Sequence, residues 1–207
     1  MADSAQPPAA DPRVEIVERL TPYRGHFRID TYKLRHRKFD GGWSDVMSRE
    51  LFERGHTAVV LPYDAARDEV VLVEQFRVGA FAAGIEPWLT EAVAGIIEPG
   101  EAPDDVVRRE ATEEAGCTVT DLTPIGTFVM TPGGCSETSA MFCGRTDSAG
   151  LGGIHGLDHE GEDIRVTVMP ALQAIEQAMQ GRVVSAYGAI PLLWLGLNRP
   201  KLRARWR

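Results

Sequence analysis

Apolar and polar residues alternate over several short stretches of the chain, a pattern that predicts β-strands with one buried face. Asp40-Gly41-Gly42 separates two of these stretches and has the chemistry of a hairpin turn. The predicted strands are Val14–Glu18, Phe27–Arg37, Val46–Phe52, Thr57–Tyr63, Val70–Gln75, Trp88–Ala94, Ile125–Met130, Ser139–Arg145 and Ile164–Met169. Strands interspersed with a few helices indicate an α/β fold.

Helical signals occur in three segments. The first begins at Pro103, because proline is favoured in the first turn of a helix, and it ends at Gly116, a typical C-terminal stop. A second helix is predicted at Ala171–Gln180. A third is predicted at Ser185–Asn198, where Pro191 should kink the helix or start a new one.

These elements divide the chain into four parts. Residues 1–12 are rich in Ala, Pro and Asp and are expected to form a disordered tail, and residues 13–54 form a small N-terminal antiparallel β-subdomain. A subdomain of this size buries little surface alone, so we expect it to pack on a partner subunit. Residues 55–198 form the main domain, and residues 199–207 form a basic tail with a frayed, solvated end.

Composition narrows the function classes. The chain has 207 residues, 43% of them hydrophobic, and a formal charge of −8, which disfavours a nucleic-acid backbone as the main partner. The three cysteines lack CxxC spacing and are expected to be reduced thiols. With no secretory-signal pattern and no apolar run long enough to span a membrane, we expect a cytoplasmic protein without a membrane partner.

The first predicted helix carries a group of acidic residues. Glu110, Glu113 and Glu114 gather on one face, with Arg109 one turn before Glu113. Like charges at i,i+4 cost roughly 0.2–0.5 kcal/mol in an isolated helix. Arg109 can offset one of the charges, and a hard divalent cation could offset the rest. The alternative is a solvated acidic helix face without function.

The segment from Gly95 to Cys117 fits the spacing G-x5-E-x7-R-E-U-x-E-E-x-G-U, where U is apolar, at every fixed position. It resembles the Nudix box, the signature of hydrolases that cleave a nucleoside diphosphate linked to another group. The resemblance implies a Nudix fold, in which a mixed β-sheet is sandwiched between helices and the box forms a loop–helix–loop.

The same resemblance implies the metal chemistry of the site. Several ions of Mg²⁺, or alternatively Mn²⁺, would be held by Glu110, Glu114 and the backbone carbonyl of Ala94. Glu113 would bind metal or support the ligands. Arg109 would orient Glu113 or Glu101 through charge-assisted hydrogen bonds.

A second likeness, to the bacterial ADP-ribose pyrophosphatases, covers most of the chain. Pro132 lies sixteen residues after the last box glycine, and the stretches GHFR, RELFERGH, VEQFR, TPGGCSE and HEGEDIRV occur in the same order. The resemblance implies a general base on the loop Gly150–Asp163. We assign Glu160 as the base and Glu162 as a further metal ligand, and the two roles could be exchanged. His155 and His159 are alternative bases on the same loop.

Substrate contacts also follow from the resemblance. Arg77 and Glu137 would meet the phosphates and terminal ribose, and an aromatic ring such as Phe27 could stack on adenine. Residues from the N-terminal subdomain would reach the substrate of the partner subunit. The complete set is His26, Phe27, Arg49, Glu50, Arg54, Arg77, Ile96, Thr131, Pro132, Gly133 and Glu137.

The implied function is metal-dependent hydrolysis of the diphosphate bond of ADP-ribose to AMP and ribose 5-phosphate by a homodimer. Two alternatives remain open. The enzyme could act on another nucleoside diphosphate sugar, such as GDP-mannose, or the chain could be a non-catalytic ADP-ribose sensor. Such sensors usually have a degraded box and a DNA-binding extension, whereas this box is intact and no helix-turn-helix pattern follows it.

Overall fold

The computed structural model describes residues 10–157 and 161–206. The chain forms two compact units. The first comprises Met1–His56 together with Val129–Thr138, and the second comprises Thr57–Phe128 with Ser139–Arg207. The N-terminal unit thus includes a loop that the sequence analysis assigned to the main domain.

The N-terminal unit is a three-stranded antiparallel sheet in the order β1 (Val14–Arg24), β2 (Arg28–His36) and β3 (Met47–Glu53). Gly41 occupies the predicted turn between β2 and β3 with φ of +92°, a conformation that glycine adopts without strain. The end of β3 also pairs in parallel with the loop 129–138, through an isolated bridge between Phe52 and Cys135. This pairing explains why the loop belongs to the N-terminal unit.

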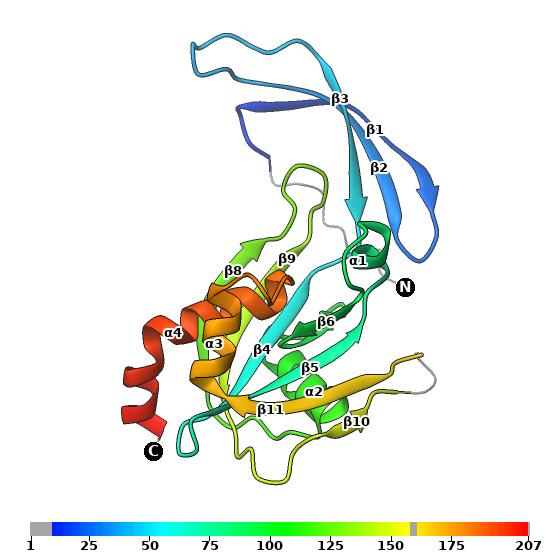
Figure 1. Ribbon diagram of the computed structural model, residues 1–207. Coiled ribbons are helices and arrows are strands. Elements are labelled where there is room, and N and C mark those ends of the chain that lie inside the picture. The colour runs from blue at the N-terminus through cyan, green and yellow to red at the C-terminus, as the bar shows by residue number, and fades with distance from the viewer. Residues whose placement is uncertain (1–9, 158–160, 207) are drawn as a thin grey trace. The chain divides into compact units, whose positions relative to one another are not determined.

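The main unit is built on a mixed eight-stranded sheet (Figure 1). Its main path is β10-β11-β5-β4-β9-β8, while β6 pairs with β5 and β7 pairs with β4. Strands β4 and β9 run parallel, and the pairs β10–β11, β11–β5, β5–β4, β5–β6 and β4–β7 are antiparallel. The strands are β4 (Thr57–Asp64), β5 (Glu69–Phe76), β6 (Trp88–Glu91), β7 (Val93–Ile96), β8 (Leu122–Val129), β9 (Thr138–Arg145), β10 (Gly153–His155) and β11 (Ile164–Pro170).

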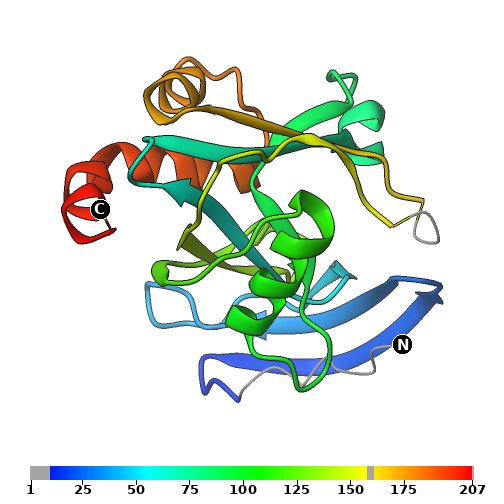
Figure 2. The ribbon, with the colours of Figure 1, turned by 90° about the horizontal axis from the view of Figure 1, so that it is seen from below.

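Helices cover both faces of this sheet. Figures 1 and 2 show α2 (Pro103–Ala115) on one face, and α3 (Ala171–Met179) and α4 (Ala186–Trp206) on the other. The short α1 (Val78–Ala82) follows β5. The predicted arrangement of a mixed sheet between helices, with a separate small antiparallel sheet at the N-terminus, is confirmed.

Helix α2 begins and ends where the sequence predicts. Pro103 starts it, two aspartates occupy its first turn, and Gly116 ends it in the left-handed conformation with φ of +58°. Its apolar side packs in a core with strands of the sheet: the fully buried residues there include Val106, Val107, Ala111, Ala115, Val60, Val71 and Val93. This packing fixes the orientation of α2 on the sheet. It therefore also determines the direction in which Glu110, Glu113 and Glu114 point.

Elsewhere the structure differs from the sequence-based expectation. The predicted strand Trp88–Ala94 is two strands, β6 and β7, that pair with different neighbours, and the long loop contains β10. Helix α1 was not predicted. No helix in the described part of the chain is long and apolar enough to cross a membrane.

The expected basic tail is the largest difference. Residues 199–206 continue α4 as a helix, in which Leu202 and Trp206 are buried. Arg199 and Arg203 both donate to the carboxylate of Asp68 in the β4–β5 turn. Burial and these ion pairs hold the end of the helix, although Pro191 and Pro200 lie inside it.

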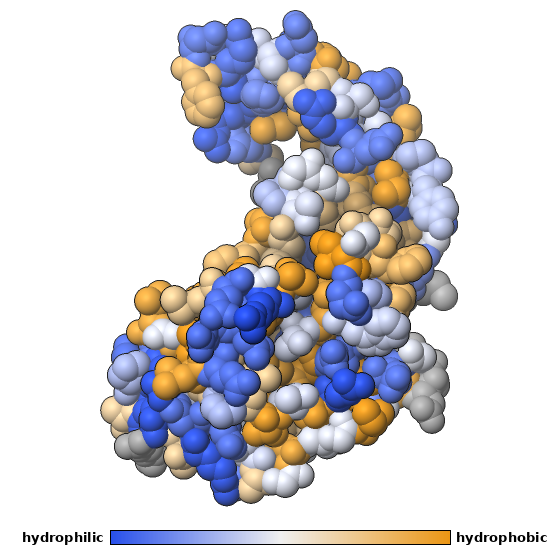
Figure 3. All heavy atoms as spheres, in the orientation of Figure 1, coloured by the Kyte–Doolittle hydropathy of each residue, from blue (hydrophilic) through white to orange (hydrophobic). Residues whose placement is uncertain are grey.

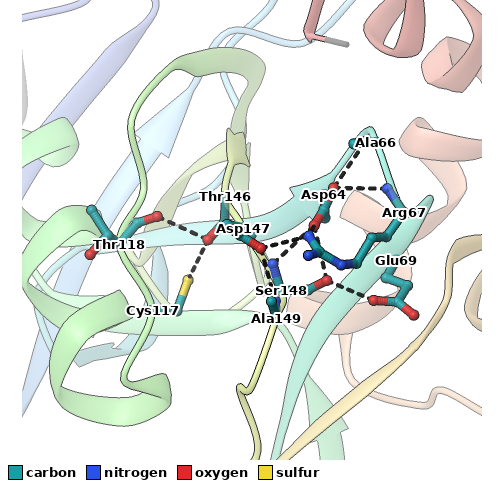
Figure 4. A network of polar contacts seen from close by, with 10 residues as sticks. All are labelled: Asp64, Ala66, Arg67, Glu69, Cys117, Thr118, Thr146, Asp147, Ser148 and Ala149. Atoms are coloured by element: carbon teal, nitrogen blue, oxygen red, sulfur yellow. Dashed lines mark hydrogen bonds and ion pairs between the residues drawn. The ribbon is translucent and has the colours of Figure 1, made fainter.

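A polar network stabilises the same turn (Figure 4). The buried carboxylate of Asp64 accepts hydrogen bonds from the backbone N–H groups of Ala66, Arg67 and Ser148, and from the side chains of Arg67 and Ser148, at 2.8–3.0 Å. The Ser148 hydroxyl also lies 2.6 Å from Glu69 Oε2, so the two carboxylates share its single proton. Burial alone would raise the pKa of Asp64, but the hydrogen bonds from Ser148 and Arg67 hold it well below its ordinary value.

Candidate active site

The candidate site lies where α2 meets β7, and Glu114 is its most buried acid. The side chain is 3% exposed. One of its oxygens accepts a hydrogen bond from the backbone N–H of Ala94 at 3.1 Å, and Gln75 Nε2 lies 3.4 Å from the other. Glu114 therefore points from α2 onto the strand that carries Ala94, the residue whose carbonyl the sequence analysis assigned to the metal.

Glu110, one turn earlier, lies against the backbone of the same strand. A Cβ atom added to Gly95 would come within 2.0 Å of Glu110 Oε1 and 2.4 Å of its Cγ. Only glycine leaves room for this carboxylate. The first fixed position of the box thus has a steric explanation: Gly95 lets Glu110 approach β7 beside Ala94.

Both carboxyl groups are costly to ionise in this protein. Burial raises the pKa of Glu110 to about 7 and that of Glu114 to about 8, and the proximity of Glu110 adds to the shift at Glu114. A nearby positive charge would favour the ionised forms.

Arg109 supplies one positive charge to these acids. Its guanidinium lies 2.8 Å from Glu110 and 3.0 Å from Glu113, and it is 3.6 Å from Glu101. A single arginine thus connects three acids of the box. This geometry agrees with the positioning role expected for Arg109.

The residues present fit a hard divalent cation. Within residues 10–157 and 161–206, no three His, Cys, Asp or Glu side chains are gathered closely enough to form a ready-made metal centre. Glu110 and Glu113 are turned toward Arg109 instead. Even so, buried carboxylate oxygens with raised pKa values, set against a strand whose glycine leaves space for one of them, are the donors that Mg²⁺ or Mn²⁺ binds.

The expected general base is not among the described residues. Glu160 and His159 lie in residues 158–160, outside the described part of the chain. Glu162 is described: its carboxylate accepts a hydrogen bond from the Leu157 N–H at 3.2 Å, and its charge contributes to the raised pKa of Glu110. His155 bonds to the Gly152 carbonyl, and its ring lies beside Gly116 at the end of α2.

Arg77 precedes α1 and lies near the acids. Its positive charge is one of the influences that lower the pKa of Glu114, although burial of that residue dominates. Arg77 Nε donates to Glu91 at 2.8 Å. Glu91 and Gln75 were not among the predicted site residues. For Gln75 the available signal was a polar side chain in the mostly buried strand β5, whereas Glu91 is the only buried residue of β6. Ile96, on β7, is partly exposed.

Several of the predicted substrate residues meet within the N-terminal unit. Arg54 donates to both carboxylate oxygens of Glu137 at 3.2 and 3.3 Å, and its guanidinium lies over the ring of Phe27 at 5.6 Å. Phe27 also makes edge contacts with His26 and Phe52. The loop 129–138 and the end of β3 therefore form one cluster.

The remaining residues of the set are exposed. Arg49 and Glu50 are neighbours on β3, so their side chains point to opposite faces of the sheet and do not meet. Thr131, Pro132 and Gly133 form the exposed start of the loop, where the Thr131 carbonyl accepts from the N–H groups of Gly134 and Cys135.

The fold and the acidic helix define a hydrolase of the Nudix class, and comparison with known proteins agrees. The model of the NUDIX domain matches residues 53–186, so the chain belongs to the Nudix family. The resemblance inferred from the box is confirmed.

Relatives within the family narrow the comparison. The chain is 49% identical over 193 residues to an ADP-ribose pyrophosphatase of Escherichia coli K12, covering 93% of this chain and 92% of the relative. It is 41% identical to an ADP-ribose pyrophosphatase of Haemophilus influenzae over 94% of this chain and 91% of the relative. A GDP-mannose pyrophosphatase of Salmonella arizonae is 37% identical over 72% of this chain and 78% of its own.

A solved structure described as an ADP compounds hydrolase has the same fold. It superposes with a TM-score of 0.63 at 22% identity and covers 90% of this chain and 97% of its own.

Proposed function

We propose that this protein is an ADP-ribose pyrophosphatase that hydrolyses the diphosphate bond of ADP-ribose to AMP and ribose 5-phosphate. The observation that carries the proposal is the pair of acids with raised pKa values, buried Glu114 and half-buried Glu110, on an intact box in a chain 49% identical to the Escherichia coli enzyme over almost its full length. A non-catalytic sensor would not need two acids held at this cost.

Glu110 and Glu114, with the carbonyl of Ala94, would hold the divalent ions, and Glu162 would add a further ligand. Bound Mg²⁺, or Mn²⁺ in its place, supplies charge neutralisation on the phosphoryl oxygens and lowers the pKa of a coordinated water. Arg109 keeps Glu113 and Glu110 in place. Glu160 is proposed as the base that accepts a proton from the attacking water.

Substrate recognition is assigned to two groups of residues. Arg77 and Ile96 belong to the main unit, where Arg77 is near the acids and suited to the diphosphate. His26, Phe27 and Arg54, with Glu137 and the loop Thr131–Gly133, belong to the N-terminal unit. Arg49 and Glu50 complete the set from the exposed part of β3.

We further propose a cytoplasmic homodimer in which the N-terminal unit packs on the partner subunit. Strand β1 exposes an apolar series, Val14, Ile16, Val17, Leu20 and Tyr23. A second exposed apolar group surrounds α1 (Figure 3) and comprises Phe76, Val78, Phe81, Ile85 and Trp88. Single exposed apolar residues are normal on a monomer, whereas each of these groups brings several together on one surface. Such groups support burial against another subunit.

The test is a panel of nucleoside diphosphate sugars assayed with Mg²⁺, with the products identified by chromatography. ADP-ribose should be hydrolysed fastest and give AMP and ribose 5-phosphate. GDP-mannose is the second candidate, because pyrophosphatases of that name are related to the chain at 37% identity. Faster hydrolysis of GDP-mannose would replace the proposed substrate, and binding of ADP-ribose without hydrolysis would support the sensor.

A further inference from the structure

Arg77 and Glu91 form an ion pair of unequal exposure. Arg77 Nε donates to Glu91 Oε2 at 2.8 Å, and the arginine side chain is 37% exposed whereas that of Glu91 is only 4% exposed. Arg77 belongs to the segment between β5 and α1, and Glu91 is the last residue of β6. The Glu91 carboxylate is thus buried, and the Arg77 guanidinium extends from it toward solvent.

Glu91 is fixed from its other side by the start of α4. Ser185 Oγ donates to Glu91 Oε1, and the Ser185 carbonyl accepts the N–H groups of Gly188 and Ala189 in the first turn of the helix. Gly188 permits this close approach, because a Cβ atom there would lie 2.8 Å from the Thr90 carbonyl oxygen. Both carboxylate oxygens of Glu91 are therefore occupied by partners from separate elements.

This arrangement leaves the outer end of the arginine available. In the described part of the chain, the ion pair uses only Nε of Arg77, and neither terminal nitrogen has a hydrogen-bond partner. A guanidinium anchored through Nε presents its two terminal nitrogens as a planar fork, which matches two oxygens of a phosphate group. Arg77 also lies close enough to Glu114 to influence its ionisation.

We infer that Glu91 is a positioning residue for catalysis: held by Ser185, it fixes Arg77 so that the terminal nitrogens of the guanidinium face the diphosphate of the substrate. The inference rests on the proposed function, because it needs a diphosphate at the site. Among the described residues, the Glu91 carboxylate has hydrogen-bond partners only in Arg77 and Ser185, so its effect on catalysis passes through Arg77.

The test is a double-mutant cycle with Glu91→Gln and Arg77→Ala, assayed with the nucleoside diphosphate sugar that the wild type hydrolyses best. Arg77→Ala should lower kcat/KM by about 100-fold and Glu91→Gln by about 10-fold. In the Arg77→Ala background, Glu91→Gln should cost less than about 2-fold, since the group it positions is gone. An equal loss in both backgrounds would show that Glu91 acts on the fold or elsewhere, and would overturn the inference.

Two further variants support the cycle. Ser185→Ala removes the second partner of Glu91 without changing any charge, and should lower kcat/KM by about 3-fold only when Arg77 is present. If Glu91→Gln does not fold, Ser185→Ala replaces it in the cycle with Arg77→Ala. Glu74→Gln is the matched control, because Glu74 on β5 pairs with Arg165 at 2.9 Å on the exposed surface. Its kcat/KM should equal that of the wild type.

Binding of inorganic pyrophosphate, measured by calorimetry without added metal, separates this inference from the proposed function. If the wild type hydrolyses no nucleoside diphosphate sugar, the proposed function fails, while weaker pyrophosphate binding by both Arg77→Ala and Glu91→Gln would still support the anchored arginine. Unchanged pyrophosphate binding in both variants, or an additive cycle in an active enzyme, would overturn the inference alone.

Discussion

Two buried acids of the main unit, Asp64 and Glu114, have pKa values shifted in opposite directions. Asp64, in the β4–β5 turn, accepts five hydrogen bonds, and its pKa is depressed in spite of burial. Glu114, on α2, is as inaccessible to solvent but lies deeper in the protein, and burial raises its pKa to about 8. Among the described residues its carboxylate has one backbone N–H donor and a long contact to Gln75. Depth of burial and the supply of hydrogen-bond donors together separate an acid that its structural contacts keep ionised from one whose ionised form a nearby cation would favour.

The comparison predicts opposite consequences when each acid is neutralised. A satisfied carboxylate contributes to stability, because its replacement leaves donors without an acceptor. An unsatisfied carboxylate opposes stability and is retained for its chemistry.

Glu114→Gln should lower kcat by at least about 1,000-fold at saturating Mg²⁺, while the far-UV circular dichroism spectrum stays that of the wild type and the melting temperature without added metal is equal or higher. The substitution removes the charge of a proposed metal ligand, and the proposed mechanism depends on the metal that it would hold. Glu176→Gln, on the exposed surface of α3, is the matched control and should keep full activity. Turnover near the wild-type rate in Glu114→Gln would contradict the metal assignment.

Glu160→Gln and Glu162→Gln should each lower kcat by roughly 100-fold or more, but for different reasons. If Glu162 is a ligand, raising the Mg²⁺ concentration should partly restore its variant, whereas a missing base cannot be replaced by metal. Activity is measured as a function of Mg²⁺ concentration for both variants. Rescue of Glu160→Gln and not of Glu162→Gln would exchange the two roles.

Asp64→Asn should reduce the free energy of unfolding by about 2–4 kcal/mol, because the amide nitrogen of asparagine would face donors that now point at a carboxylate. The folded fraction should keep its kcat, since the turn lies outside the proposed site. Urea unfolding followed by circular dichroism measures the loss. Asp147→Asn is the control: that acid pairs with the same Arg67 but is largely exposed, so little change in stability is expected.

The same contrast explains what the sequence could predict. The spacing from Gly95 to Glu114 is local, and a helix register converts it directly into a shared face, so the box and α2 were predicted correctly. Glu91 and Gln75 could not be found in this way. Their importance comes from partners 14 and 39 residues away, Arg77 and Glu114. The pairing of β5 with β6 brings Arg77 to Glu91, and the packing of α2 on the sheet brings Glu114 to Gln75.

Errors at the C-terminal end have a similar cause. The basic residues after Asn198 predicted a solvated tail, because the sequence does not reveal that the Asp68 carboxylate accepts hydrogen bonds from Arg199 and Arg203.

The loop 129–138 was assigned to the main domain because it follows the box in sequence. Its pairing with Phe52 on β3 depends on contacts about 80 residues apart, which no local pattern encodes.

The pH dependence of stability gives the finest test of the comparison. The pKa of Asp64 is depressed in the folded protein, so its contribution to stability is complete above the unfolded value of about 3.9 and is lost as the pH falls through the folded value. The difference in unfolding free energy between wild type and Asp64→Asn should therefore be constant near pH 7 and shrink progressively below about pH 4. Urea titrations of both proteins at several pH values measure it. A difference that persists unchanged to pH 3 would mean that the hydrogen-bonding shape of the side chain, and not its charge, stabilises the turn.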